Sequence, residues 1–343
     1  MDEVAPRLAT IAIPTFNRVE RLKRAVGSAR AQDYRSVEIL IVDNASEDAT
    51  KEVCQALVKE DPRIRYIRQP CNVGPVRNFE TGLENAQGYY FMWLSDDDWI
   101  TPNYVRRCSA ELETGHHAIV AGRDYWNVGD RVDPEPIVTA MEPEPVPRML
   151  NYLKVVASNA AMSGLSRTDD LRAQLPISRR VAGDWLWLLA ILSKGTLGVV
   201  PDAHIFRDRG GVSSSFHDIA VQLGSGKLTS RLPRTLALIN VLTALARGKG
   251  FGNPQTGFSR LHFLVKVAFV ATVRLNPLGD LMELTQLKLQ RLMPYKGYDV
   301  RKSCNHLTLT IPLLILSKPL SAPHQPSGRD SSDATKVLSP VHT

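Results

Sequence analysis

Cysteine is scarce in this sequence, and the few residues present are scattered. Four cysteines occur in 343 residues, and no two of them form a C-x-x-C pair; they are Cys54, Cys71, Cys108 and Cys304. A disulfide scaffold or a structural zinc site needs several cysteines at short, regular spacings, so the scattered positions of these four argue against both. The same scarcity is typical of a protein that works in a reducing compartment.

Long apolar runs are also missing. A membrane-spanning helix needs about 18 to 20 uncharged apolar residues, and the best candidate, residues 261–275, is interrupted by Lys266 and Arg274. The first ten residues have no basic segment followed by an apolar one, so no secretory signal is expected. We therefore expect a cytoplasmic protein, with peripheral contact to the cytoplasmic face of a membrane as a hypothesis.

The charge is unevenly distributed along the chain. The formal net charge is +7, yet residues 1–203 carry 24 basic and 28 acidic side chains, whereas residues 204–318 carry 16 basic and 5 acidic ones. Such an asymmetry often marks a surface for phosphate groups or anionic lipid. Nucleic acid is a weaker interpretation, because aromatic residues are not interleaved with the basic ones and no binding motif is present.

The first hundred residues alternate between β-prone and helical patterns. Strands are predicted at 8–13, 37–42, 64–67 and 89–94, and helices at 20–31, 48–60 and 76–85. Strand–helix–strand units of this length predict a Rossmann-like α/β fold with a mainly parallel sheet. Ligands bind at the carboxyl ends of strands in such sheets, and polar clusters follow three of these strands: Thr15 with Asn17, Asp43 with Asn44, and Asp96–Asp98.

The rest of the chain is predicted to be less regular at first and then helical. Residues 130–147 hold five prolines and five acidic residues, which is typical of a loop. Apolar helices with basic flanks are expected at 232–246 and 261–275. We predict three parts: a catalytic domain over 1–217, a helical basic region over 218–318 that associates with acceptor or membrane, and a disordered Ser- and Pro-rich tail over 319–343.

Three consecutive carboxylates, Asp96, Asp97 and Asp98, end a predicted buried strand. Carboxylates this close resist joint ionisation unless a cation or hydrogen-bond donors compensate. Oxygen ligands of this type select Mg²⁺ or Mn²⁺, which would bridge them to a substrate diphosphate. The alternative is a solvated acidic loop or helix N-terminus, which would need no metal.

Four motifs resemble those of the family 2 glycosyltransferases of the GT-A fold. They are I-P-T-F-N-R at 13–18, V-D-N-A-S-E-D-A-T at 42–50, N-V-G-P-V-R-N at 72–78 and L-S-D-D-D-W-I-T-P at 94–102. The resemblance covers about the first 200 residues. It implies a GT-A nucleotide-diphospho-sugar transferase that inverts the anomeric carbon, with a UDP-, dTDP- or GDP-sugar as donor and a glycan or lipid-linked saccharide as acceptor.

The resemblance also implies roles for individual residues. It places Pro14, Thr15 and Asn17 beside the nucleotide, and makes Asp43 and Asn44 the pair that reads base and ribose. Many relatives have a second aspartate where this chain has Asn44. The resemblance also places Arg77 near the base or the diphosphate of the nucleotide sugar. The alternative role of Arg77 is a surface salt bridge.

The metal and the catalytic base are implied in the same way. Asp97, five residues before Pro102, matches the carboxylate that coordinates Mn²⁺ or Mg²⁺ directly; Asp96 would face ribose and metal, and Asp98 would support them. Ser95 stands where many relatives have another aspartate. Asp184 matches the general base that takes the proton of the acceptor hydroxyl. Its alternative role is a cap on the helix that follows.

The apolar segment after Asp184 holds two tryptophans. Trp185 and Trp187 fall on different sides of a helix. One is therefore expected in the core, and the other is available for stacking on a sugar.

A closing loop is implied at 206–214, where Arg207 and Arg209 would clamp the diphosphate. Relatives usually have a histidine in place of Arg209. An arginine cannot ligate a metal, but its planar fork suits a diphosphate. His204 and His217 are alternative ligands nearby. These departures leave open a second function, a non-catalytic nucleotide-sugar-binding scaffold of a glycan assembly complex.

Overall fold

The computed structural model describes residues 5–115, 117–128, 131–155, 160–208, 221, 223, 232–247, 265–268 and 270–272. The chain divides into two compact units, residues 1–288 and 289–343. All helices and strands given below belong to the first unit.

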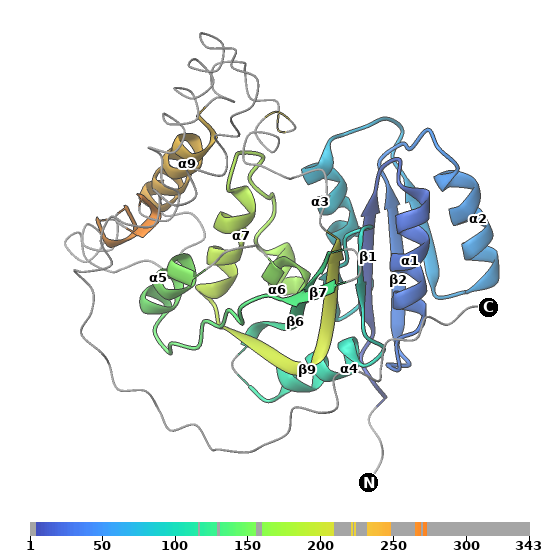
Figure 1. Ribbon diagram of the computed structural model, residues 1–343, viewed down its shortest axis with the longest axis horizontal. Helices are drawn as coiled ribbons and strands as arrows, with labels where there is room; N and C mark the ends of the chain where they lie inside the picture. The colour runs from blue at the N-terminus through green and yellow to red at the C-terminus, as the bar shows by residue number, and fades with distance from the viewer. Residues whose placement is uncertain are drawn as a thin grey trace. The chain divides into compact units, whose positions relative to one another are not determined.

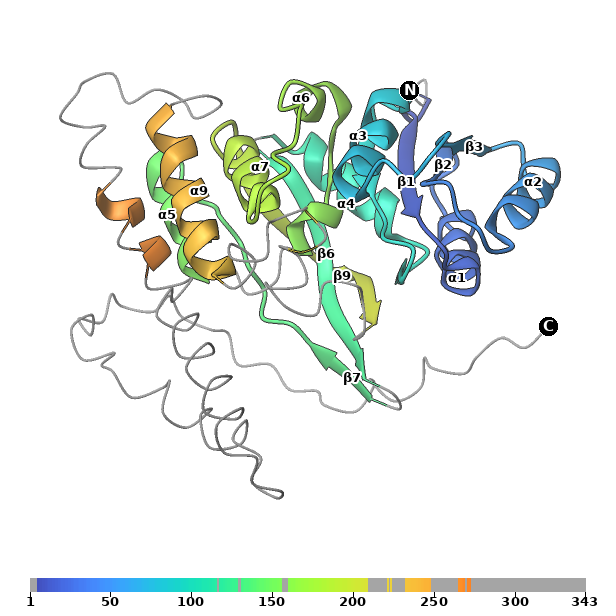
Figure 2. The same ribbon diagram turned by 90° about the horizontal axis from the view of Figure 1, so that it is seen from above.

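The strands of the described residues form one mixed sheet (Figures 1 and 2). They run in the order β3-β2-β1-β4-β8-β6-β9-β5, and β7 pairs with β6 outside this path. Their bounds are β1 Ala9–Thr15, β2 Val37–Asp43, β3 Ile64–Arg68, β4 Tyr90–Trp93, β5 Asp98–Ile100, β6 His117–Val128, β7 Arg131–Pro134, β8 Leu165–Arg167 and β9 Thr196–Asp208.

The first half of the sheet is parallel, as the alternation of patterns predicted. Strand β1 pairs in parallel with β2 and β4, and β2 pairs in parallel with β3. Beyond β4 the sheet is mixed, because β8 pairs antiparallel with both β4 and β6, whereas β6 and β9 are parallel. The α/β class and the parallel arrangement of the first four strands are therefore confirmed.

Two hydrophobic cores cover the two faces of the sheet. On one face Ile11, Ile13 and Met92 pack with residues of α1 (Val19–Arg30), α2 (Thr50–Glu60) and α4 (Tyr104–Glu113). On the other, Ala12 and Trp93 pack with residues of α3 (Pro75–Asn85), α5 (Pro145–Val155), α6 (Thr168–Arg172) and α7 (Gly183–Leu192). Figures 1 and 2 show α1 and α3 on opposite sides of β1. Burial on both faces explains why the strands read as continuous apolar runs.

The helices are close to those predicted from apolar spacing in the first hundred residues. Their bounds are α1 Val19–Arg30, α2 Thr50–Glu60, α3 Pro75–Asn85, α4 Tyr104–Glu113, α5 Pro145–Val155, α6 Thr168–Arg172, α7 Gly183–Leu192 and α9 Pro233–Arg247, with a short 3₁₀ helix, η1, at Ala160–Ser163.

The prediction of a loop over residues 130–147 was wrong in part. Residues 131–134 form β7, which pairs with residues 125–128 of β6, and α5 already begins at Pro145. Prolines misled the prediction because they are tolerated at the ends of edge strands and in the first turn of a helix.

The basic rear region is described only in part. Helix α9 confirms the helix predicted at 232–246, and its Ala237 and Val241 join the same core as α7. The predicted domain boundary at 217 and the tail from 319 lie outside the described residues. Among the described helices, none combines the length and apolar character needed to cross a membrane.

Candidate active site

The ends of strands β1 and β2 meet the chain that leaves β4, and polar side chains gather there. Thr15 lies opposite Asp43 in the parallel register, and the backbone N–H of Asn44 donates to the carbonyl of Thr15 at 3.0 Å. The hydroxyl of Thr15 donates to Oδ2 of Asp96 at 2.8 Å. The structure thus brings three of the predicted polar clusters to one edge of the sheet. Pro14, which pairs with Val42, is buried directly before them.

Asn17 joins the loops after β1 and β2. Its φ of 54° lies in the left-handed region, which asparagine tolerates better than most residues. Its side-chain oxygen accepts from the backbone N–H of Glu47 at 2.7 Å, and its own N–H donates to the hydroxyl of Ser46 at 2.9 Å. Asn17 therefore fixes the shape of this edge through contacts within the protein.

Asp43 is completely buried and surrounded by donors. Its Oδ1 accepts from the N–H of Ser46 at 2.8 Å, and its Oδ2 accepts from the hydroxyl of Tyr66 at 2.7 Å and from the guanidinium of Arg68. Burial by itself would raise the pKa of Asp43, but these hydrogen bonds outweigh it and lower the pKa below its ordinary value. Asp43 is therefore a fixed negative charge at the end of β2.

Asn44 uses both ends of its amide to hold the loop before α3. Its Oδ1 accepts from the N–H of Val73 and its Nδ2 donates to Oδ1 of Asn72, both at 2.9 Å. The loop then turns at Gly74, whose φ of 83° suits glycine, and Pro75 opens the helix. An asparagine is suited to this position because its amide can both accept from and donate to the loop before α3.

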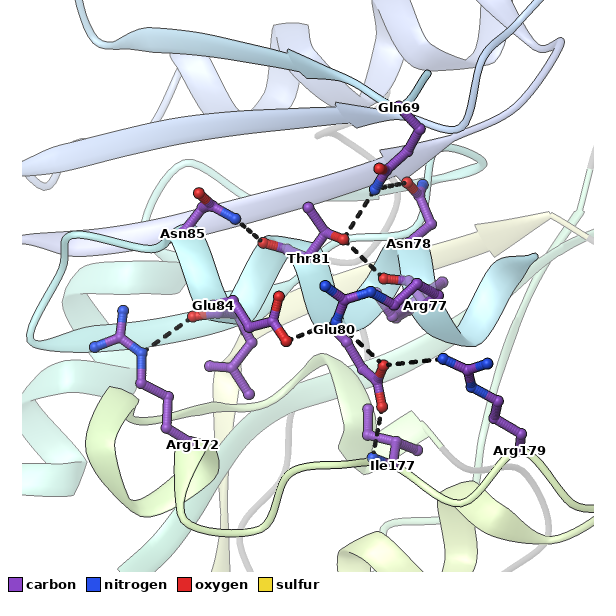
Figure 3. A network of polar contacts seen from close by, with 12 residues as sticks. Gln69, Arg77, Asn78, Glu80, Thr81, Glu84, Asn85, Arg172, Ile177 and Arg179 are labelled. Carbon is purple, nitrogen blue, oxygen red and sulfur yellow. Dashed lines mark hydrogen bonds and ion pairs between the residues drawn. The ribbon is translucent and has the colours of Figure 1, made fainter. Parts of the chain in front are cut away.

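Arg77 points along its own helix in this structure (Figure 3). Its guanidinium pairs with Glu84 at 2.6 Å and with Glu80 at 3.5 Å. Within the described residues, Arg77 makes no ion pair or hydrogen bond with Asp43 or Asp96, the carboxylates at the strand ends. The arrangement matches the salt-bridge alternative, and a donor contact by Arg77 stays a prediction.

Arg18, Arg21 and Arg24 face the acidic cluster, and the sequence-based reasoning assigned them no role. Nη1 of Arg18 lies 3.1 Å from Oδ1 of Asp96 and 3.0 Å from Oδ2 of Asp97. Nη1 of Arg21 lies 3.6 Å from the same Asp97 oxygen, and Arg24 donates to the main-chain carbonyl of Asp97 at 2.8 Å. The sequence contained a signal for this, because Arg18, Arg21 and Arg24 are spaced three residues apart and such residues share one face of a helix.

Asp98 points to a different partner from those of Asp96 and Asp97. It lies opposite Arg207 in the β5–β9 pair, with Oδ2 3.9 Å from Nη1, and Arg207 also donates to Asp124 at 3.1 Å. Burial raises the pKa of Asp98 to about 7; Arg207 opposes this shift, and neighbouring carboxylates add to it. Asp124 is a further buried carboxylate that no sequence motif indicated.

Asp184 lies in the first turn of α7, and the chain before it is tightly wound. A Cβ on Gly183 would lie 1.9 Å from the carbonyl oxygen of Ser178, so only glycine fits there. Burial raises the pKa of the Tyr152 hydroxyl, and the charges of Asp184 and Asp124 raise it further. Asp184 and Asp124 each lie within electrostatic range of the buried Tyr152 hydroxyl.

Both tryptophans of α7 are buried. Trp185 is 9% exposed and Trp187 is 4% exposed, and the ring of Trp187 lies 5.0 Å from that of Trp93. The prediction that one of the two packs in the core is confirmed. The helix is apolar on all sides, so the second tryptophan is also enclosed.

Glu80 ties α3 to the segment that leads into α7 (Figure 3). Its side chain is 3% exposed, and its Oε1 accepts from the backbone N–H of Ile177 at 2.8 Å. Arg77 and Arg179 approach its other oxygen at 3.5 and 3.9 Å. A carboxylate on α3 thus anchors the chain six residues before Gly183.

We expect Glu80→Ala to lower the free energy of unfolding by about 2 kcal/mol, because it leaves the buried Ile177 N–H without its acceptor. Glu80→Gln keeps an acceptor oxygen and should lose less than half as much. Glu84, which is 40% exposed on the same helix, is the matched control, and Glu84→Ala should stay within about 0.5 kcal/mol. Urea unfolding checks all three, and equal losses at both positions would contradict the anchoring role.

Asp96 and Asp97 are the two carboxylates that could bind a divalent cation at this site. Asp96 and Asp97 direct one oxygen each at the same nitrogen of Arg18, so their oxygens converge on one cationic point. Mg²⁺ commonly binds through one or two carboxylates together with waters and substrate phosphates, so this pair suits such an ion. Within the part of the chain that the structure describes, no group of three or more Asp, Glu, His or Cys side chains is arranged for a metal.

Two predicted residues of the closing loop lie outside the described residues, namely Arg209 and His217. Of the others, Arg207 pairs with Asp98 and Asp124, and its side chain is 15% exposed. His204 is in β9, where its ring lies 5.1 Å from Tyr125 and its Nε2 lies 3.2 Å from the carbonyl of Pro201.

Part of the chain matches known proteins in sequence. Residues 10–167 match the family described as "Glycosyl transferase family 2". Over 94 residues the chain is 43% identical to the GalNAc(5)-diNAcBac-PP-undecaprenol beta-1,3-glucosyltransferase of Campylobacter jejuni, covering 27% of this chain and 30% of that protein. Over 154 residues it is 32% identical to the putative colanic acid biosynthesis glycosyl transferase WcaA of Escherichia coli, covering 44% and 55%.

The fold also has a counterpart among solved structures. The mannosyltransferase PcManGT of Pyrobaculum calidifontis, solved with GDP-Man and Mn²⁺, superposes with a TM-score of 0.51 at 14% identity, over 89% of this chain and 86% of that one. At this identity the likeness concerns the fold alone, and it supports the GT-A architecture. The chain spans less than two thirds of the length of the two curated relatives above.

Proposed function

From the premise that residues 10–167 form a glycosyl transferase family 2 domain, we propose that this chain transfers a sugar from a nucleoside-diphosphate donor to a hydroxyl of a glycan or lipid-linked acceptor. The transfer inverts the configuration at the anomeric carbon. The donor is a UDP-, dTDP- or GDP-sugar.

One observation carries the proposal. Thr15, Asp43 and Asp96 come from three separate strand ends and meet at one edge, where Thr15 lies opposite Asp43 and donates to Asp96 at 2.8 Å. In open α/β sheets this edge is where nucleotides bind. Asp43 would act here through its fixed negative charge, because its side chain is completely buried and its oxygens accept from Ser46, Tyr66 and Arg68. A direct contact of Asp43 with the ribose or the base stays a prediction.

The chemical step would require a base on the acceptor side. Asp184 would accept the proton of the acceptor hydroxyl as that oxygen bonds to the anomeric carbon. The bond between the anomeric carbon and the diphosphate oxygen breaks at the same time, and its electron pair leaves with the nucleoside diphosphate. The place of Asp184 in the first turn of α7, where its charge acts on the buried hydroxyl of Tyr152, supports this role.

Asp96 and Asp97 would hold Mn²⁺ or Mg²⁺, and such an ion stabilises negative charge that develops on a departing phosphate. Asp98 would support these two through the short strand it begins. The buried guanidinium of Arg207 would add positive potential on the same side. Arg209, outside the described residues, stays a proposed diphosphate contact.

The names of the relatives support a role in cell-surface glycan assembly. One acts on an undecaprenol-linked acceptor, and the other is assigned to colanic acid biosynthesis. The basic excess of residues 204–318 would suit an acceptor that carries a lipid diphosphate or an acidic glycan. It would equally suit peripheral contact with anionic lipid, which flotation with anionic liposomes at low salt would test.

The test is the release of nucleoside diphosphate from a panel of nucleotide sugars, with Mn²⁺, Mg²⁺ or EDTA present. We expect release from one donor class that requires a divalent ion and is lost in Asp97→Ala and Asp184→Ala. Asp33→Ala is the control, because Asp33 is an exposed residue whose ion pair among the described residues is with Arg106. Binding of a nucleotide sugar without any release, with acceptor glycans supplied, would favour the scaffold function instead.

A further inference from the structure

Arg18 occupies the point where the two carboxylates of the proposed cation site converge. Its Nη1 lies 3.1 Å from Asp96 and 3.0 Å from Asp97, and these distances are those of charge-assisted hydrogen bonds. The three side chains are largely enclosed, with exposed fractions of 20% for Arg18, 8% for Asp96 and 13% for Asp97. One nitrogen therefore bridges two carboxylates at a partly buried position.

The local backbone holds Arg18 in this place. Arg18 is the N-cap residue of α1, and the neighbouring N–H of Val19 donates to the carboxylate of Asp48 at 3.1 Å. From the next two turns, Arg21 approaches Asp97 at 3.6 Å, and Arg24 binds the main-chain carbonyl of Asp97. The start of α1 thus presents a row of guanidinium groups to the acidic loop.

Two cations cannot share this point. A divalent ion bound by Asp96 and Asp97 would lie about 2.1 Å from their oxygens, and the guanidinium now bridges those same oxygens. The ion would also meet the full positive charge of Arg18 in surroundings that screen it weakly. Binding of the ion therefore requires Arg18 to leave the carboxylate pair.

We propose that Arg18 is an internal counter-ion that competes with the divalent cation for Asp96 and Asp97, and so sets the affinity of the ligand-free chain for that cation. The proposal rests on the cation site of the proposed function. Arg21 adds a weaker contribution of the same kind, because its contact is longer and its side chain is 38% exposed. A donor diphosphate would favour the exchange, since it offers the displaced guanidinium new anionic partners.

The experiment measures Mn²⁺ affinity directly, without nucleotide and without turnover. Free Mn²⁺ is titrated by electron paramagnetic resonance into the full chain and its variants. Arg18→Gln should tighten Mn²⁺ binding by about tenfold or more, the ratio expected when a competing charged hydrogen bond is lost. Arg18→Lys keeps a positive charge at the site and should gain less than Arg18→Gln. Arg21→Gln should gain about two- to threefold.

The matched control is Arg106→Gln, which removes an arginine paired with Asp33 on the surface and should leave Mn²⁺ affinity unchanged. Adding Asp97→Asn to Arg18→Gln should abolish the gain, because it removes one of the two carboxylates. If Arg18→Gln does not fold, as judged by circular dichroism, Arg21→Gln and Arg18→Lys carry the test.

Unchanged or weaker Mn²⁺ binding in the folded Arg18→Gln and Arg21→Gln variants would overturn the inference. If, in addition, no variant binds Mn²⁺ but nucleoside diphosphates still raise the melting temperature, the counter-ion role fails while the donor-binding function stands. If nucleotides also fail to bind, the proposed function fails with it.

Discussion

Replacing Asp184 by asparagine should slow sugar transfer by about 10²- to 10⁴-fold, which is the contribution expected of a positioned general base. Asparagine keeps the size of the side chain and can still bond at the first turn of α7, so the fold should be retained. The affinity for the nucleoside diphosphate should not change, because Asp184 is assigned to the acceptor side. Single-turnover product formation and calorimetric titration with the nucleotide measure the two quantities separately.

Asp169→Asn is the control for this prediction. Asp169 is an aspartate in the first turn of α6, its side chain is 94% exposed, and within the described part of the chain its ion pair is with Arg172. The Asp169→Asn variant should transfer sugar at the same rate as the unmodified chain. A rate for Asp184→Asn within about threefold of that value would leave Asp184 only the role of an acidic residue in the first turn of α7. The predicted cap on a helix starting at Trp185 is corrected by the structure, because α7 begins at Gly183 and its N-cap residue is Ala182.

Asp43→Ala should produce the largest loss of stability, about 3 kcal/mol in the free energy of unfolding. The change removes the acceptor of Ser46, Tyr66 and Arg68 at a position with no exposed surface. Loss of one partner from a buried charged network commonly costs about 3 to 5 kcal/mol, and the lower end applies because the side chain of Arg68 is 32% exposed. Chemical unfolding at neutral pH measures the loss.

The same variant should be less sensitive to acid than the unmodified chain. The pKa of Asp43 is lowered in the fold, so its contribution to stability is complete above its unfolded value of about 3.9 and fades as the pH falls through the folded value. The stability difference between Asp43→Ala and the unmodified chain should therefore shrink below about pH 4. A difference that stays constant down to pH 2 would show that the loss comes from packing and not from the charge.

Much of the parallel half of the sheet and its helices could be predicted from the sequence, because the strands are buried on both faces and the helices have one apolar side. Thr15, Asp43 and Asp96 were correctly expected at one edge, since the carboxyl ends of parallel strands lie together. The hairpin formed by β6 and β7 was missed because proline and acidic residues hide an edge strand.

Partner choice within the site could not be predicted. Nothing in local sequence shows that Arg18 bridges Asp96 and Asp97, since these residues lie some eighty positions apart in the chain. The same holds for the enclosed pair of Arg207 and Asp124. Such contacts depend on how α1 and β9 pack against the acidic loop, and only the tertiary structure supplies that.

The central claim is that a nucleoside diphosphate binds where β1, β2 and the chain after β4 meet. The direct measurement is a thermal-shift screen of UDP, dTDP and GDP with Mn²⁺, carried out on the unmodified chain and on Asp96→Asn. At about one hundred times its dissociation constant, one nucleotide should stabilise the unmodified chain by about 2.7 kcal/mol, or several degrees in melting temperature, and should have much less effect on the variant. No shift with any nucleotide, or an equal shift in both proteins, would contradict the claim.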